Sequence, residues 1–127
     1  FVEEATLAGI RAAREAWERT DLRSRLARHH RDVDRVFAEW SQTWLSPGFR
    51  DWSVEEYLPA IRCPVVAIQG EQDEYATMRQ VELIAESVPG AELLKLPGCG
   101  HAPHRDRPEA VLDAIAALVG RAARAQG

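Results

Sequence analysis

The spacing of apolar residues between Cys63 and His101 predicts a strand, a helix and a second strand. The run Val65–Gln69 is short, almost continuously apolar and rich in branched side chains, which is typical of a strand covered on both faces in a parallel sheet. Apolar residues at helical spacing follow, and Pro89–Gly90 ends that pattern. A second strand, Glu92–Leu96, comes next. This segment therefore predicts a β-α-β unit with parallel strands.

Three helices are predicted before this unit, of which the last is a short one that begins at the capping box Ser53–Glu56 and ends before Pro59. Apolar residues on one face indicate a helix from Glu4 to about Thr20. From Leu22 to Trp44 the apolar positions recur at near-heptad spacing, so we expect one longer second helix, which Ser46–Gly48 ends. Six of the nine aromatic residues gather in or just after this second helix: Phe37, Trp40, Trp44, Phe49, Trp52 and Tyr57. They form either the core between two helices or, as the grouping favours, the entrance of an apolar pocket.

A last helix is predicted after His101. Asp106, Pro108 and Glu109 have the order of a cap, an early proline and a reciprocal glutamate at a helix start. The apolar face that follows should cover the sheet: Val111, Leu112, Ile115, Leu118 and Val119.

Length and charge narrow the class of protein. With 127 residues, 46% of them hydrophobic, the chain is long enough for one ordinary globular core. Its 16 Lys and Arg against 20 Asp and Glu give a net charge of −4, which disfavours a nucleic-acid partner. No apolar run approaches the roughly 20 residues of a membrane helix, so we expect no membrane partner either.

The two cysteines indicate a reducing compartment. Cys63 precedes the first strand and Cys99 follows the second, which places them at opposite ends of a parallel pair, roughly 17–20 Å apart. A disulfide needs Cα atoms closer than about 7 Å. We therefore predict two free thiols, a packing role for Cys99, and a cytoplasmic protein.

Two candidate catalytic side chains, Asp73 and His101, come just after the two predicted strands. A crossover connection returns the chain to the same end of the sheet, so both should lie at the carboxyl edge, where open α/β sheets build their sites. An aspartate there can accept the Nδ1 proton of a histidine and leave Nε2 free as a general base. We expect the two side chains within hydrogen-bond reach.

Other roles for these residues stay open. Asp73 shares its turn with Glu71 and Glu74, and it would also serve as a helix cap. His101 would also serve as an ordinary loop histidine. Its spacing to His104 and Asp106 suggests zinc ligands, although a turn rich in glycine and proline, with no fourth ligand in view, is a poor zinc site.

The sequences Gly70-Glu71-Gln72-Asp73 and Gly98-Cys99-Gly100-His101, with the strands before them, resemble the acid and histidine segments of the α/β-hydrolase superfamily. The resemblance implies that Asp73, selected by the Gly-x-x-Asp spacing, is the acid and that His101 is the base. In that family the nucleophile precedes both and lies in Gly-x-Ser-x-Gly, which occurs nowhere in these residues. The resemblance covers Ile61 to Val119 well and the preceding helical segment loosely.

We therefore expect an α/β fold, the C-terminal portion of an α/β hydrolase, with helical lid residues 1–60 before core residues 61–127. The parent would be a serine-type enzyme that hydrolyses an ester, lactone or related carbonyl compound, with a small-molecule substrate and no cofactor or metal. This chain alone should be inactive, and it should pair with the N-terminal half of the hydrolase or with a second copy of itself. The alternative is a non-catalytic protein-interaction module built on the same β-α-β unit.

Overall fold

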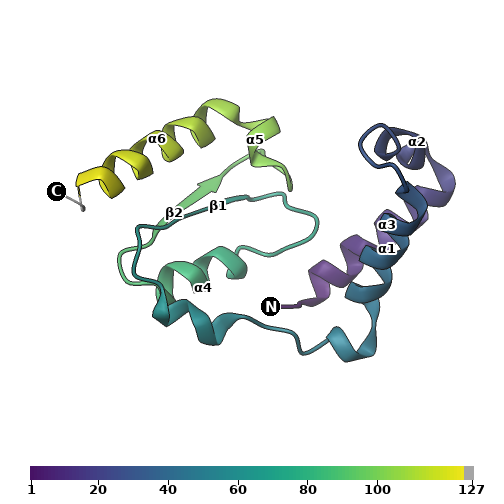
Figure 1. Cartoon of the computed structure of the whole chain (residues 1–127), viewed down its shortest axis with the longest axis horizontal. Helices are drawn as coiled ribbons and strands as arrows, with labels where there is room; N and C mark the ends of the chain where they lie inside the picture. Colours follow the sequence, from purple (N-terminus) through teal and green to yellow (C-terminus); the bar gives the residue numbers. More distant parts are fainter. Residues whose placement is uncertain (125–127) are drawn as a thin grey trace. The chain divides into compact units, whose positions relative to one another are not determined.

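The computed structural model describes residues 1–124 of the chain, which divides into two compact units, Phe1–Ser53 and Val54–Gly127 (Figure 1). Residues 125–127, the end of the predicted core segment, lie outside the described residues. The division falls before the 3₁₀ helix η2 (Glu55–Ala60), because η2 contacts helix α4 (Arg79–Ser87) of the second unit. The role of residues 1–60 as a lid stays a prediction.

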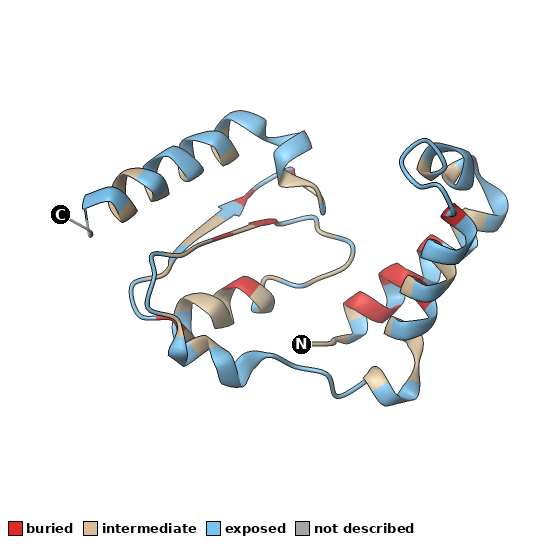
Figure 2. Cartoon of the chain, viewed as in Figure 1, coloured by how far each residue is buried: buried red, intermediate tan, exposed pale blue. Residues whose placement is uncertain are grey.

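The first unit is helical. It contains α1 (Glu4–Arg19), α2 (Leu22–Leu26), α3 (Val33–Leu45) and a short 3₁₀ helix, η1 (Pro47–Phe49). Helix α1 packs on α3. The contacting face of α1 is buried at positions that follow one another at about one helical turn: Leu7, Ile10 and Ala13 (Figure 2). Of the described residues, Ile10 is among the most completely buried, with 1% of its surface exposed.

The single long helix that we expected from Leu22 to Trp44 is wrong. The chain leaves the helical path after Leu26, and a new helix begins at Val33, where the Asp32 side chain accepts the N–H of Arg35 as an N-cap. The Arg23 guanidinium then joins α2 to α3 through both oxygens of Asp34, at 2.7 and 2.6 Å. The near-heptad spacing of apolar residues did not reveal this break, because the signal for the new helix start is a polar residue, the N-cap Asp32.

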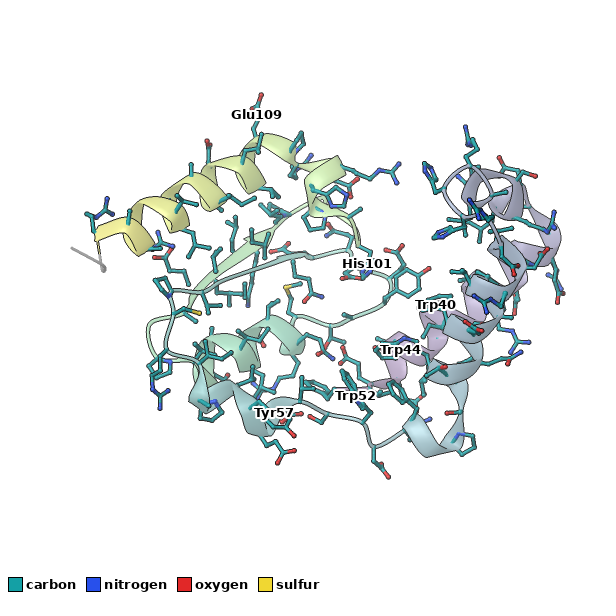
Figure 3. All side chains as sticks on the ribbon, in the orientation of Figure 1. Trp40, Trp44, Trp52, Tyr57, His101 and Glu109 are labelled. Atoms are coloured by element: carbon teal, nitrogen blue, oxygen red, sulfur yellow. The ribbon has the colours of Figure 1, made fainter. Side chains whose placement is uncertain are left out.

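Aromatic rings of the first unit pack on one another. Trp17 of α1 stacks on Phe37 of α3 at 4.0 Å between ring centroids. Trp44 and Trp52 meet edge to face at 5.9 Å, and Phe49 stacks on Trp52 (Figure 3). These rings contact one another but are half-buried or exposed, so neither the helix core nor the pocket entrance that we predicted for them is settled. Tyr57 differs, since it lies in the second unit and is 64% exposed.

The second unit contains the predicted β-α-β arrangement. Strands β1 (Val66–Gly70) and β2 (Glu92–Leu96) are parallel, in a register that pairs Val66 with Glu92 and Gly70 with Leu96. Helix α4 contacts both strands, and α6 (Pro108–Arg124) contacts β1 from the other side (Figure 1). The predicted β-α-β unit is confirmed, with β1 shifted by one residue.

A turn and a short helix complete this unit. Gly90, with a φ of 75°, turns the chain between α4 and β2 in a conformation that favours glycine, and a Cβ there would meet open space. The short helix α5 (Pro103–Asp106) lies between the histidine loop and α6. Asp106 therefore ends α5 and does not cap α6 as predicted.

A buried glutamine links the first strand to the crossover helix. Gln69 is 5% exposed, and its side-chain amide donates to the carbonyl oxygens of Ala76 and Thr77, at 3.0 and 3.2 Å. A buried amide without hydrogen-bond partners destabilises the fold, and these two bonds avoid that cost. They also connect β1 to the segment just before α4. Within residues 1–124, no helix is both long and apolar enough to cross a membrane.

Gly70 lets the two loops at the carboxyl edge come together. A Cβ at this position would overlap the carbonyl oxygens of both Cys99 and Gly100. These are backbone atoms, so a side chain at position 70 would push the histidine loop away from the end of β1. The close approach of the two loops therefore requires glycine here.

We predict that Gly70→Ala lowers the free energy of unfolding by about 3 kcal/mol or more, the upper range for overpacking a well-packed site. Gly48→Ala is the matched control, because a Cβ at Gly48 meets no atom within 4 Å. Chemical denaturation of the purified protein measures both values. Equal stability of Gly70→Ala and the wild type would contradict the close approach.

Candidate functional site

Asp73 lies in a tight turn that continues from β1. Backbone bonds hold the turn against the second loop, since Glu71 N–H donates to Leu96 O at 3.0 Å and Gln72 N–H to Cys99 O at 2.9 Å. The Asp73 carboxylate accepts the N–H of Tyr75 at 2.8 Å, which is an Asx-turn. This side chain is only 6% exposed. The turn thus presents a shielded carboxylate at the carboxyl edge of the sheet.

His101 lies in the loop that follows β2 (Figure 3). Gly98, with a φ of 62°, bends this loop in the left-handed region. The Gln72 side chain then accepts the N–H of Cys99 at 2.9 Å, which fastens the loop to the acid turn. As a result, two loops distant in sequence form one bonded structure at the ends of neighbouring strands.

The structure brings Asp73 and His101 together as the sequence predicted. The imidazole Nδ1 lies 2.9 Å from Oδ1 and 3.0 Å from Oδ2 of the carboxylate. The histidine side chain is 58% exposed, while the aspartate is almost fully shielded. This geometry lets Asp73 hold the Nδ1 proton and orient the ring, which leaves Nε2 able to accept a proton from another group.

Tyr75 borders the pair, a role that the sequence did not specify. Its ring meets the His101 ring edge to face, at 4.8 Å between centroids. Burial raises the pKa of the Tyr75 phenol, and the negative charges of Glu74 and Asp73 raise it further. The phenol is therefore neutral at physiological pH. It restricts the rotation of the imidazole by packing.

The zinc alternative gains no support from the described residues. Among residues 1–124, no three His, Cys, Asp or Glu side chains are grouped as metal ligands. Asp106, one of the three residues in that spacing, instead accepts the N–H of Gly100 at 2.8 Å. His104 is exposed on α5.

Both cysteines are free thiols, as predicted. Cys63 is exposed, whereas Cys99 is buried, with 1% of its surface exposed. Burial raises the pKa of the Cys99 thiol, and the neighbouring carboxylate of Asp106 raises it further, although Arg107 opposes this effect. The burial and the raised pKa of Cys99, two residues before His101, fit the packing role that we predicted for it.

Comparison with known families finds a match over most of the chain. The sequence profile described as the alpha/beta hydrolase family matches residues 2–114, which is most of the chain. The comparison with curated protein sequences finds no significant match.

Solved structures whose fold is similar to that of this chain include the following three hydrolases. A hydrolase from Pseudomonas aeruginosa PA01 is 27% identical, with a TM-score of 0.54, and the match covers 75% of this chain and 38% of that one. A thermophilic esterase from Thermogutta terrifontis is 22% identical, with a TM-score of 0.54 and coverage of 96% and 52%. A serine hydrolase involved in carbazole degradation is 16% identical, with a TM-score of 0.58 and coverage of 70% and 34%. The chain thus spans between about a third and a half of the length of these proteins.

The two thiols provide a test of the burial of the histidine loop. We predict that iodoacetamide alkylates Cys63 much faster than Cys99, because the raised pKa of the Cys99 thiol lowers its thiolate fraction. Burial slows the reaction further. Peptide mass spectrometry of the folded protein measures both rates, and the unfolded protein is the control in which both thiols should react. Comparable rates in the folded protein would mean that the loop is open.

Proposed function

This chain belongs to the α/β-hydrolase family, and we propose that it supplies the acid and the base of a serine-type hydrolase. The substrate class is an ester, lactone or related carbonyl compound. The nucleophile and the oxyanion donors would come from a longer parent enzyme, since Gly-x-Ser-x-Gly does not occur in these 127 residues. The observation that carries this proposal is the contact of 2.9 Å between His101 Nδ1 and the shielded Asp73 carboxylate.

In the proposed reaction, Asp73 accepts a hydrogen bond from the Nδ1–H of His101 and so fixes the ring tautomer, while the carboxylate keeps its charge. Nε2 then takes the proton of a serine hydroxyl as that oxygen attacks the carbonyl carbon, and the negative carboxylate stabilises the imidazolium that forms. The same imidazolium donates its proton to the leaving group, which leaves an acyl-serine. Nε2 then takes a proton from a water that attacks this acyl group, and returns the proton to the serine oxygen as the acid product leaves. The unequal exposure of the two side chains supports these roles, because the acid is shielded while the base remains accessible.

We also propose that the 127-residue chain pairs with another chain. Within the described residues the sheet has two strands, and each offers one edge whose N–H and C=O groups pair with no strand. Such edges are templates for pairing with a further strand. The partner would be the N-terminal half of the hydrolase, or a second copy of this chain.

Replacing the base tests the first proposal. We predict that His101→Ala in the parent enzyme lowers kcat for a p-nitrophenyl ester by a factor on the order of 10³ or more, and that Asp73→Asn costs the same or less. His104→Ala is the matched control, because His104 is an exposed histidine three residues away, and it should retain activity. Near-normal hydrolysis by His101→Ala would assign the base elsewhere and favour the non-catalytic interaction module.

The isolated chain gives a second test. We predict no esterase activity from it alone, because the nucleophile is missing, and a mass by light scattering above that of a monomer. A separately expressed N-terminal half of the hydrolase should restore activity on mixing. A cooperatively melting monomer would disprove the pairing, and activity of the isolated chain that disappears in His101→Ala would disprove the need for a second segment.

A further inference from the structure

Three consecutive N–H groups of the histidine loop donate to side chains from outside that loop. Cys99 N–H donates to Gln72 Oε1 at 2.9 Å, Gly100 N–H to Asp106 Oδ2 at 2.8 Å, and His101 N–H to Glu74 Oε2 at 3.3 Å. Backbone N–H groups in an irregular loop have no partners from secondary structure, so side chains must satisfy them or leave them to water. Here each of the three has its own acceptor.

Two of these acceptors are carboxylates, and they converge on Gly100. The ideal Cβ position of Gly100 lies 3.5 Å from both Asp106 Oδ2 and Glu74 Oε2. Two negative groups this close to one residue repel each other, and the two N–H dipoles that point toward them offset that repulsion. Hydrogen bonds to a charged acceptor are roughly twice as strong as neutral ones. The arrangement therefore places one short charge-assisted bond, at Gly100, and one longer bond, at His101, on the two peptide groups that precede the His101 side chain.

The two carboxylates come from different segments of the chain. Glu74 directly follows the acid Asp73 in the turn after β1, whereas Asp106 lies at the end of α5. The loop is thus held both by the segment that carries the acid and by the segment that leads into α6. A loop bonded to one segment can still move with that segment, whereas bonds to two segments restrict its position.

We infer that Asp106 and Glu74 are positioning residues, which hold the backbone of the histidine loop so that His101 Nδ1 meets Asp73. This inference rests on the proposed function, because it assigns the two carboxylates a role that acts through the base. Asp106 makes the shorter bond, so its loss has the larger effect. A displacement of the imidazole by about 1 Å is enough to cost on the order of 100-fold in rate.

Kinetics of the parent enzyme test this role with an ester substrate. We expect Asp106→Ala to lower kcat by about 10- to 100-fold with little change in KM, because the base is misplaced while the substrate still binds. Asp106→Asn keeps an oxygen acceptor of the same shape, so it should recover most of the loss. Glu74→Gln should likewise cost less than Glu74→Ala. Asp113→Ala, which removes an exposed aspartate from α6, is the matched control.

A double variant distinguishes positioning from general structural support. In the His101→Ala background, Asp106→Ala should cause no further loss, because the group that Asp106 positions is gone. A residue that only keeps the enzyme folded would lower activity by the same factor in both backgrounds, and that result would overturn the inference. So would an unchanged kcat in Asp106→Ala, while His101→Ala still abolished activity.

The Gly100 amide gives a readout that does not depend on activity. Its hydrogen exchange, measured by NMR, should accelerate in Asp106→Ala and stay as in the wild type in Asp113→Ala, because only Asp106 accepts this N–H. Unchanged exchange in Asp106→Ala would overturn the inference. If Asp106→Ala does not fold, Asp106→Asn and Glu74→Gln in the two backgrounds decide it. Normal activity of His101→Ala would overturn both this inference and the proposed function.

Discussion

The parallel pairing of β1 with β2 is the constraint on which the site depends. Because Gly70 pairs with Leu96, both strands end at the same level, and the two segments that follow them start side by side. The acid and the histidine are 28 residues apart in sequence, yet their contact needs only short loops beyond the strand ends. An antiparallel pairing would place the ends of the two strands at opposite edges of the sheet.

Strand pairing alone does not explain the close contact of the two loops. Gly70 has no side chain that would keep the two loops apart. The Gln72 side chain then accepts a hydrogen bond from the backbone N–H of Cys99 and so connects them. The Asp73 carboxylate then has two tasks, since it accepts the N–H of Tyr75 within its own turn and faces His101 across the loops. The same carboxylate therefore stabilises the conformation of the acid turn and makes the contact with His101.

The elements of the second unit were predictable because their hydrophobic patterns are strong and short-ranged. Branched apolar residues in Val65–Gln69 and helical spacing before Pro89 identified the crossover, and the topology of a crossover fixes which loop ends meet. That topology placed Asp73 and His101 at one edge of the sheet, and the Gly-x-x-Asp spacing of the α/β-hydrolase resemblance selected Asp73 from the carboxylates of its turn. The break between α2 and α3 did not, because one polar cap at Asp32 outweighs apolar spacing that continues past it.

The side chains that accept hydrogen bonds from the histidine loop could not be predicted from sequence patterns either. Asp106 has the spacing of a helix cap, but its carboxylate bonds a glycine N–H six residues earlier. Gln72 and Glu74 are ordinary turn residues by composition. Bonds from a side chain to the backbone of another loop depend on coordinates within about 1 Å, and hydrophobic periodicity contains no information at that scale.

The turn at Gly90 has a practical consequence for labelling this protein. It lies at the amino end of β2, about 17 Å along the strand from the loop that carries His101. It has an open environment, and exposed turns of this kind accept inserted residues better than any segment of a sheet. A short peptide tag inserted next to Gly90, with the glycine itself kept, would report on the protein from the opposite edge of the sheet and leave both loops of the acid and the histidine intact.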